Sequence, residues 1–134
     1  MSKKILQTLL IIGALFYFAE FILHFFGLPI LEHDKIFLPT HDRYIAIFAL
    51  TYAALLILIA TNPFKYRHLW MLAMLGILLS MINANYIAAI GGYGRFFATP
   101  NLDTDLRVIG FGAFLWYFVT CVAFVRMEKN LSTH

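Results

Sequence analysis

Residues Ile5–Phe26 read ILQTLLIIGALFYFAEFILHFF, a run of apolar side chains interrupted by few polar ones. A helix needs about 20 mostly apolar residues to cross the roughly 30 Å hydrocarbon core of a bilayer. Lys3 and Lys4 precede the run, as in a signal peptide, but the run ends without a small-x-small cleavage pattern. It also exceeds the roughly 7–15 apolar residues of a signal peptide. The stretch therefore predicts a retained membrane-spanning helix.

Three further runs have a similar length and character: Tyr44–Thr61, Leu69–Ile90 and Leu106–Val125. None alternates between apolar and polar residues, so helices are favoured over strands. Pro63 disfavours helical geometry at Asn62, which gives the second run a defined end. We expect an all-α integral membrane protein, with residues 1–134 forming one four-transmembrane-helix bundle and two longer loops on the extracytoplasmic side.

The composition supports this class, because 62% of residues are hydrophobic and only 13% are charged. Soluble domains average about 45–50% and about 25%. The net charge of +3 is spread over short clusters, without the continuous basic face that a nucleic-acid partner would require. The expected partners are membrane lipids, and a larger membrane complex or a homo-oligomer is also open.

The distribution of Lys and Arg predicts the orientation in the membrane. An even number of spans puts both termini on one side, and that side carries six basic residues against four on the other. The six are Lys3, Lys4, Lys65, Arg67, Arg126 and Lys129, and the four are Lys35, Arg43, Arg95 and Arg107. The positive-inside rule then predicts cytoplasmic termini, with the plasma (inner) membrane as location and residues 27–43 and 91–105 outside.

Two ionisable residues inside the first span are the strongest functional signal. Glu20 and His24 are spaced i,i+4 and share a helix face, with Tyr17 one turn before Glu20. Glu20 lies on the order of 9 Å, and Asn83 on the order of 10 Å, below the outer ends of their helices. Intramembrane ionisable groups usually face the bundle interior and mark functional sites. We expect an outer-half pocket with Glu20 and His24 as catalytic candidates. Its expected lining is Tyr17, Tyr52, Asn83, Asn85 and Arg107.

Two other interpretations of these residues stay open. Glu20 could hydrogen-bond Asn83 and serve only to lock helix packing. A metal could be held by His24, His41 and Asp42, since imidazole and carboxylate suit zinc, iron or copper. The single Glu-x-x-x-His spacing differs from the paired Glu-x-x-His motifs of di-iron bundles. Haem held by two histidines is a further alternative, and the sequence does not identify a cofactor.

Four short spans with one glutamate in the first resemble, in outline, the small multidrug-resistance transporters. That resemblance implies a proton-coupled transporter with Glu20 as the carrier. The chain departs from the family in its longer loops, and no signature residue beyond Glu20 can be matched. DoxX-like proteins share the four-helix outline as well.

Three functions follow from these residues. The first is an accessory subunit, or a module that binds a lipid-like or quinone-like molecule in the outer half of the bilayer. The second is a membrane enzyme that uses Glu20, His24 and His41 for metal-dependent or acid–base chemistry. The third is the small proton-coupled transporter. A transporter would also need polar groups in the inner half.

Overall fold

The computed structural model describes residues 2–30, 38–89 and 102–132, and within them the chain forms four helices. These are α1 (Ser2–Phe26), α2 (Pro39–Thr61), α3 (Arg67–Ala89) and α4 (Leu102–Ser132). The predicted all-helical membrane bundle is confirmed. Three of the helices are long and apolar enough to cross a membrane, whereas the apolar part of α3 is the shorter stretch Arg67–Asn83. Within the two predicted loops, residues 31–37 and 91–101 lie outside the described residues.

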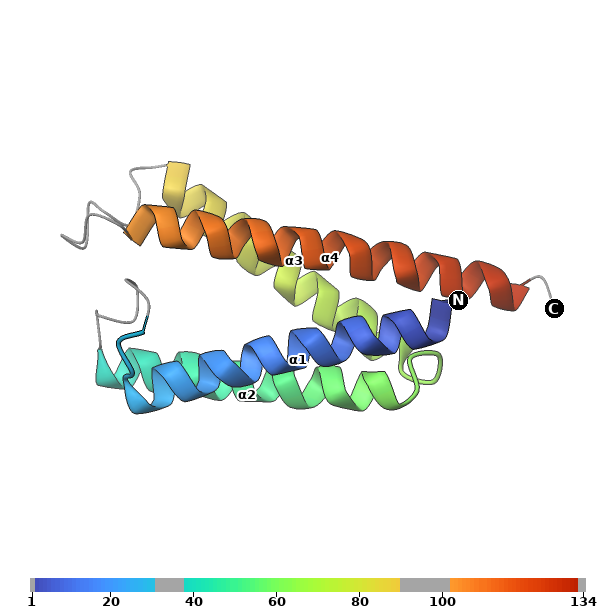
Figure 1. The fold of residues 1–134 in the computed structure, drawn as a ribbon, viewed down its shortest axis with the longest axis horizontal. Coiled ribbons are helices and arrows are strands. Elements are labelled where there is room, and N and C mark those ends of the chain that lie inside the picture. The colour runs from blue at the N-terminus through green and yellow to red at the C-terminus, as the bar shows by residue number, and fades with distance from the viewer. Residues whose placement is uncertain (1, 31–37, 90–101, 133–134) are drawn as a thin grey trace.

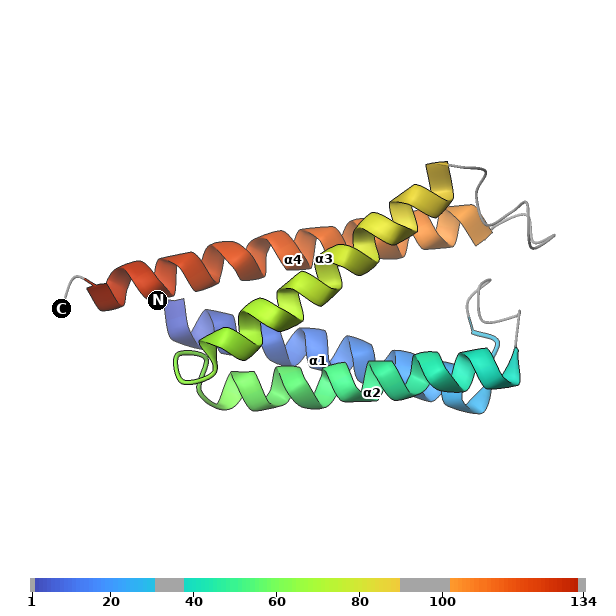
Figure 2. The same cartoon turned by 180° about the vertical axis from the view of Figure 1, so that it is seen from behind.

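The four helices run back and forth along one long axis (Figures 1 and 2). The start of α1, the end of α4 and the short α2–α3 turn lie together at one end, here called the terminal end. The end of α1, the start of α2, the end of α3 and the start of α4 lie at the opposite, distal end. α1 and α2 lie side by side along their whole length, whereas α3 crosses obliquely toward α4 at the distal end.

Local chemistry sets the helix ends, which differ from the predicted span limits. α1 stops at Gly27, whose φ of 62° is the left-handed conformation that favours glycine. The Leu28 amide then donates to the Leu23 carbonyl at 3.0 Å, the bond expected of a Schellman ending. α2 begins at Pro39 rather than at Tyr44, because proline is pre-organised for the first helical turn. His41 and Asp42 therefore belong to the helix and not to a loop.

The apolar core is concentrated at the terminal end, where all four helices contribute. α1 supplies Leu6, Leu10 and Ala14, α2 supplies Leu56, Ile59 and Ala60, α3 supplies Trp70, Ala73, Met74 and Ile77, and α4 supplies Ala123, Phe124 and Met127. The Trp70 and Phe124 rings stack with centroids 3.8 Å apart. Toward the distal end, α2 instead presents the buried alanines Ala46, Ala49 and Ala53. Small side chains let helices approach closely in a membrane, which explains the continuous α1–α2 contact.

Two glycines receive aromatic side chains from neighbouring helices. The Trp116 indole of α4 occupies the space where Gly13 would carry a Cβ, and its Nε1–H donates to the Leu9 carbonyl at 2.8 Å. The Tyr52 hydroxyl of α2 likewise lies against Gly76 of α3. Each contact requires glycine, because any larger residue would collide with the ring. We call these two glycine positions notches, and they fix the position of α4 on α1 and of α3 on α2.

Candidate functional site

The structure joins three ionisable side chains near the distal end of the α1–α2 pair, and we call Glu20, His24 and Asp42 the distal cluster. His24 Nε2 lies 3.3 Å from Glu20 Oε2, and His24 Nδ1 lies 2.9 Å from Asp42 Oδ1. The side chains of Glu20, His24 and Asp42 are only 17%, 11% and 8% exposed. One imidazole is therefore held between two carboxylates in a largely buried place.

Asp42 connects the cluster to the start of α2. Its Oδ1 faces His24, while its Oδ2 accepts the Leu38 backbone N–H at 2.6 Å. The first N–H groups of a helix have no partner within the helix, so this carboxylate satisfies one of them. A negative charge in the first helical turn is also favourable to the helix dipole. Asp42 thus caps α2 and positions His24 at the same time.

The arrangement constrains the protonation of His24 and what the cluster can bind. A neutral imidazole donates from one nitrogen only, whereas the protonated ring donates from both. Hydrogen bonds to both ionised carboxylates therefore require the imidazolium form. The second oxygen of Glu20 has no hydrogen-bond partner among the described residues.

Two tyrosines lie one helical turn from the distal cluster, toward the middle of the bundle. The rings of Tyr17 and Tyr52 stack with centroids 5.4 Å apart and an interplanar angle of 26°. Tyr17 shares the helix face of Glu20, and the Tyr52 hydroxyl reaches α3 at Gly76. Of the predicted lining residues, the structure thus brings Tyr17 and Tyr52 together, with Tyr17 one helical turn from Glu20.

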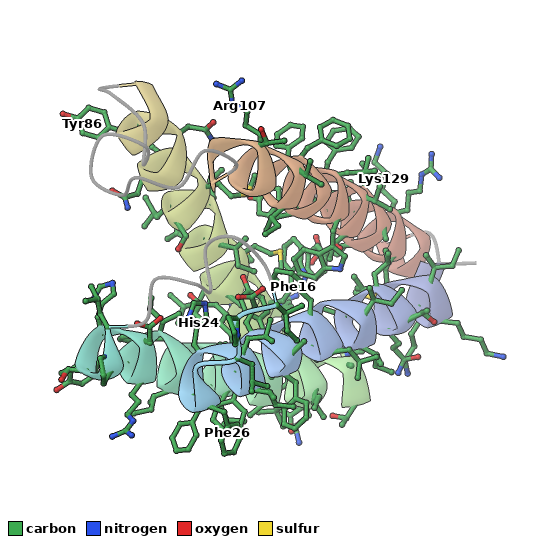
Figure 3. The ribbon with its side chains drawn as sticks, turned by 60° about the vertical axis from the view of Figure 1, so that its left-hand side comes forward. Phe16, His24, Phe26, Tyr86, Arg107 and Lys129 are labelled. Atoms are coloured by element: carbon green, nitrogen blue, oxygen red, sulfur yellow. The ribbon has the colours of Figure 1, made fainter. Side chains whose placement is uncertain are left out.

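The other predicted lining residues lie elsewhere. Asn83 and Asn85 are exposed on α3, and the Asn85 amide donates to the Met81 carbonyl of its own helix at 2.8 Å. Arg107 is exposed on α4 and, like Tyr86, points away from the helix pair that carries His24 (Figure 3). The structure does not bring Asn83 to Glu20, whose described polar partner is His24. The oblique course of α3 separates side chains that have the same depth.

The predicted metal ligands are only partly brought together. Asp42 contacts His24, but His41 is exposed at the start of α2. Across the three described ranges, no group of three or more His, Cys, Asp or Glu side chains is arranged to hold a metal ion. Both ring nitrogens of His24 face carboxylate oxygens, so a metal would have to displace one of these contacts. His33 and Asp34 lie outside the described residues.

The sequence predicts Asp42 to lie in the outside connection 27–43, whereas it is buried in the first turn of α2 and belongs to the distal cluster. The signal that could have revealed this is Pro39 followed by an acidic residue within one turn, which is typical of a helix start. An acidic side chain at that position accepts a hydrogen bond from a backbone N–H at the start of the helix and so turns away from solvent.

No family model, curated protein or solved structure matches the chain.

Proposed function

We propose that this protein is a membrane-embedded binding module that holds the polar head of a lipid-like or quinone-like molecule at the distal cluster. The observation that supports this most is the pair of largely buried carboxylates on either side of His24. Ionisable side chains are costly to keep within a membrane-spanning segment. Helix packing alone would need one neutral hydrogen bond, so three ionisable groups favour a functional role.

The geometry also indicates the chemistry of the head group. Both His24 nitrogens face carboxylates, so His24 is poorly placed to donate to a carbonyl group of a ligand. The second oxygen of Glu20 accepts hydrogen bonds instead. A hydroxyl or amine is therefore favoured, and among quinone-like molecules the reduced quinol, which carries O–H donors, is favoured over the quinone. The apolar tail would lie along the lipid-facing surface.

Small molecules that co-purify with the protein test this proposal. Wild-type protein in mild detergent should carry one amphiphile per chain, measured by native mass spectrometry and identified after extraction. His24→Ala should lose it, whereas His68→Gln, an exposed histidine at the terminal end, should keep it. Wild-type protein without a bound amphiphile, or equal retention by His24→Ala, would contradict the proposal.

We further propose that all four helices cross the plasma membrane, with both termini in the cytoplasm and the distal cluster in the outer half. The excess of Lys and Arg at the terminal end supports this orientation. Single cysteines placed at Ser2 or Asn101 in a Cys121→Ala background test it in intact cells. An impermeant thiol reagent should label position 101 and spare position 2. The reverse pattern would overturn the orientation.

Acid–base catalysis is the second candidate, and the Glu20–His24 contact favours it. A proton can pass between Nε2 and Oε2, which are 3.3 Å apart, while Asp42 holds the ring in place. Such an enzyme would convert its amphiphile, so the extracted molecules would include a product that differs from the substrate by a proton-dependent rearrangement or hydrolysis.

The transporter hypothesis has less support. A transporter would need polar groups in the inner half, whereas the apolar core fills the terminal half of the bundle.

A further inference from the structure

A groove of about 470 Å³ runs along the α1–α2 seam at the terminal end, far from the distal cluster. Its walls include Lys4, Gln7, Thr8 and Ile11 from α1 and Ile57 and Thr61 from α2. The core residues Leu6 and Leu10 lie on other positions of α1 and pack inward. The groove is thus on the lipid-facing side of the helix pair.

A hydrogen bond shapes the floor of the groove. Gln7 Nε2 donates to the Ala60 carbonyl at 2.8 Å and ties the start of α1 to the end of α2. The hydroxyls of Thr8 and Thr61 donate to the carbonyls of Lys4 and Leu58 in their own helices. These two hydroxyl groups therefore have no hydrogen left to donate to a ligand in the groove. The charged donor that remains at the groove is the exposed Lys4 ammonium.

The polarity of the walls changes along the helix axis. Lys4 and Thr61 lie at the end of the seam, whereas Ile11 and Ile57 lie deeper in the span. Lys4 and Ile11 are separated by about 10 Å along the helix, at about 1.5 Å per residue. A phospholipid has the same order, with a phosphate at the interface and an acyl chain below. No acidic residue lines the groove, so its charge complements an anionic head group.

We propose that this groove is a binding site for an anionic phospholipid of the leaflet on the terminal side. The phosphate contacts the Lys4 ammonium, and one acyl chain lies along Ile11 and Ile57. This site does not depend on the proposed function, because it shares no residue with the distal cluster.

Lipid titration of the detergent-purified full chain tests the site. Phosphatidylglycerol and phosphatidylcholine with the same acyl chains are added, and bound lipid is counted by native mass spectrometry. Phosphatidylglycerol should bind more tightly, and Lys4→Ala should weaken it about five-fold, as expected for one basic residue near a membrane surface. The matched control is Lys3→Ala, which removes a neighbouring exposed lysine outside the groove and should leave binding unchanged.

A second variant addresses the acyl chain. Ile57→Trp fills the apolar part of the groove at an exposed position and should lower the binding of both lipids. Equal binding of the two lipids by the wild type would overturn the proposal. Equal losses in Lys3→Ala and Lys4→Ala would also overturn it, because they would show diffuse attraction to the basic end of the molecule. Unchanged binding in Ile57→Trp would place the lipid elsewhere.

Discussion

The two ends of the bundle are held together by different kinds of interaction. At the terminal end, apolar side chains from four helices interlock around Leu10, Leu56 and Phe124. At the distal end, the α1–α2 pair is joined by alanines and by three ionisable groups, while α3 and α4 diverge from it. Van der Waals packing of apolar side chains can hold helices together in lipid, whereas ionisable groups within a span are costly. This difference is consistent with the proposal that the distal cluster binds a ligand.

Asp42→Ala should have the largest effect on stability. It leaves both His24 Nδ1 and the Leu38 amide without the carboxylate that each faces. Removing one partner of a buried ion pair costs about 3–5 kcal/mol. Thermal unfolding in detergent, followed by circular dichroism, measures the loss. Thr51→Ala, at an exposed position on the same helix, is the control, and an equally small effect of both variants would show that the cluster does not hold α2 to α1.

Leu10→Ala probes the apolar end and should rank second. Leu10 is fully buried in the core, so its truncation leaves a cavity that costs about 2–5 kcal/mol. Leu15→Ala on the same helix removes the same atoms from a side chain that is 63% exposed and should cost less than about 0.5 kcal/mol. Denaturant titration of both variants gives the comparison. Equal losses would mean that the core at the terminal end is not packed as described.

Gly13→Ala tests the notch that positions α4 and should have the smallest effect of the three. The added methyl group collides with the Trp116 ring and displaces its hydrogen bond to Leu9. Overpacking of this kind costs about 1–3 kcal/mol. Gly112→Ala adds the same methyl group to α4 in open space and should be neutral or slightly stabilising. Tryptophan fluorescence and unfolding temperature report both changes, and a neutral Gly13→Ala would remove the notch from the account.

Much of the fold follows from the sequence, because hydrophobic length and Pro63 determine the helices almost independently of tertiary contacts. The shared face of Glu20 and His24 follows in the same way from helical periodicity. Which side chains of different helices lie next to each other does not follow from the sequence in this way. Asn83 matches Glu20 in depth, but the rotation and tilt of α3 leave it exposed. A depth calculated from the rise per residue does not include the rotation or the tilt of a helix. Asp42 was misplaced because the start of α2 depends on Pro39 and on capping rather than on hydrophobicity.

The central claim is that the distal cluster binds a ligand and is not merely a structural tie. Glu20→Gln tests it most directly, because the amide keeps the size of the side chain but loses its charge. The account predicts that Glu20→Gln inserts and purifies, and that it loses less stability than Asp42→Ala because the amide still accepts a hydrogen bond from His24, yet it no longer retains the amphiphile found in native mass spectra. Glu128→Gln, an exposed glutamate on α4, should retain it fully. If Glu20→Gln retains the amphiphile as the wild type does, while Glu20→Leu only lowers the unfolding temperature, then Glu20 is structural and the claim is contradicted.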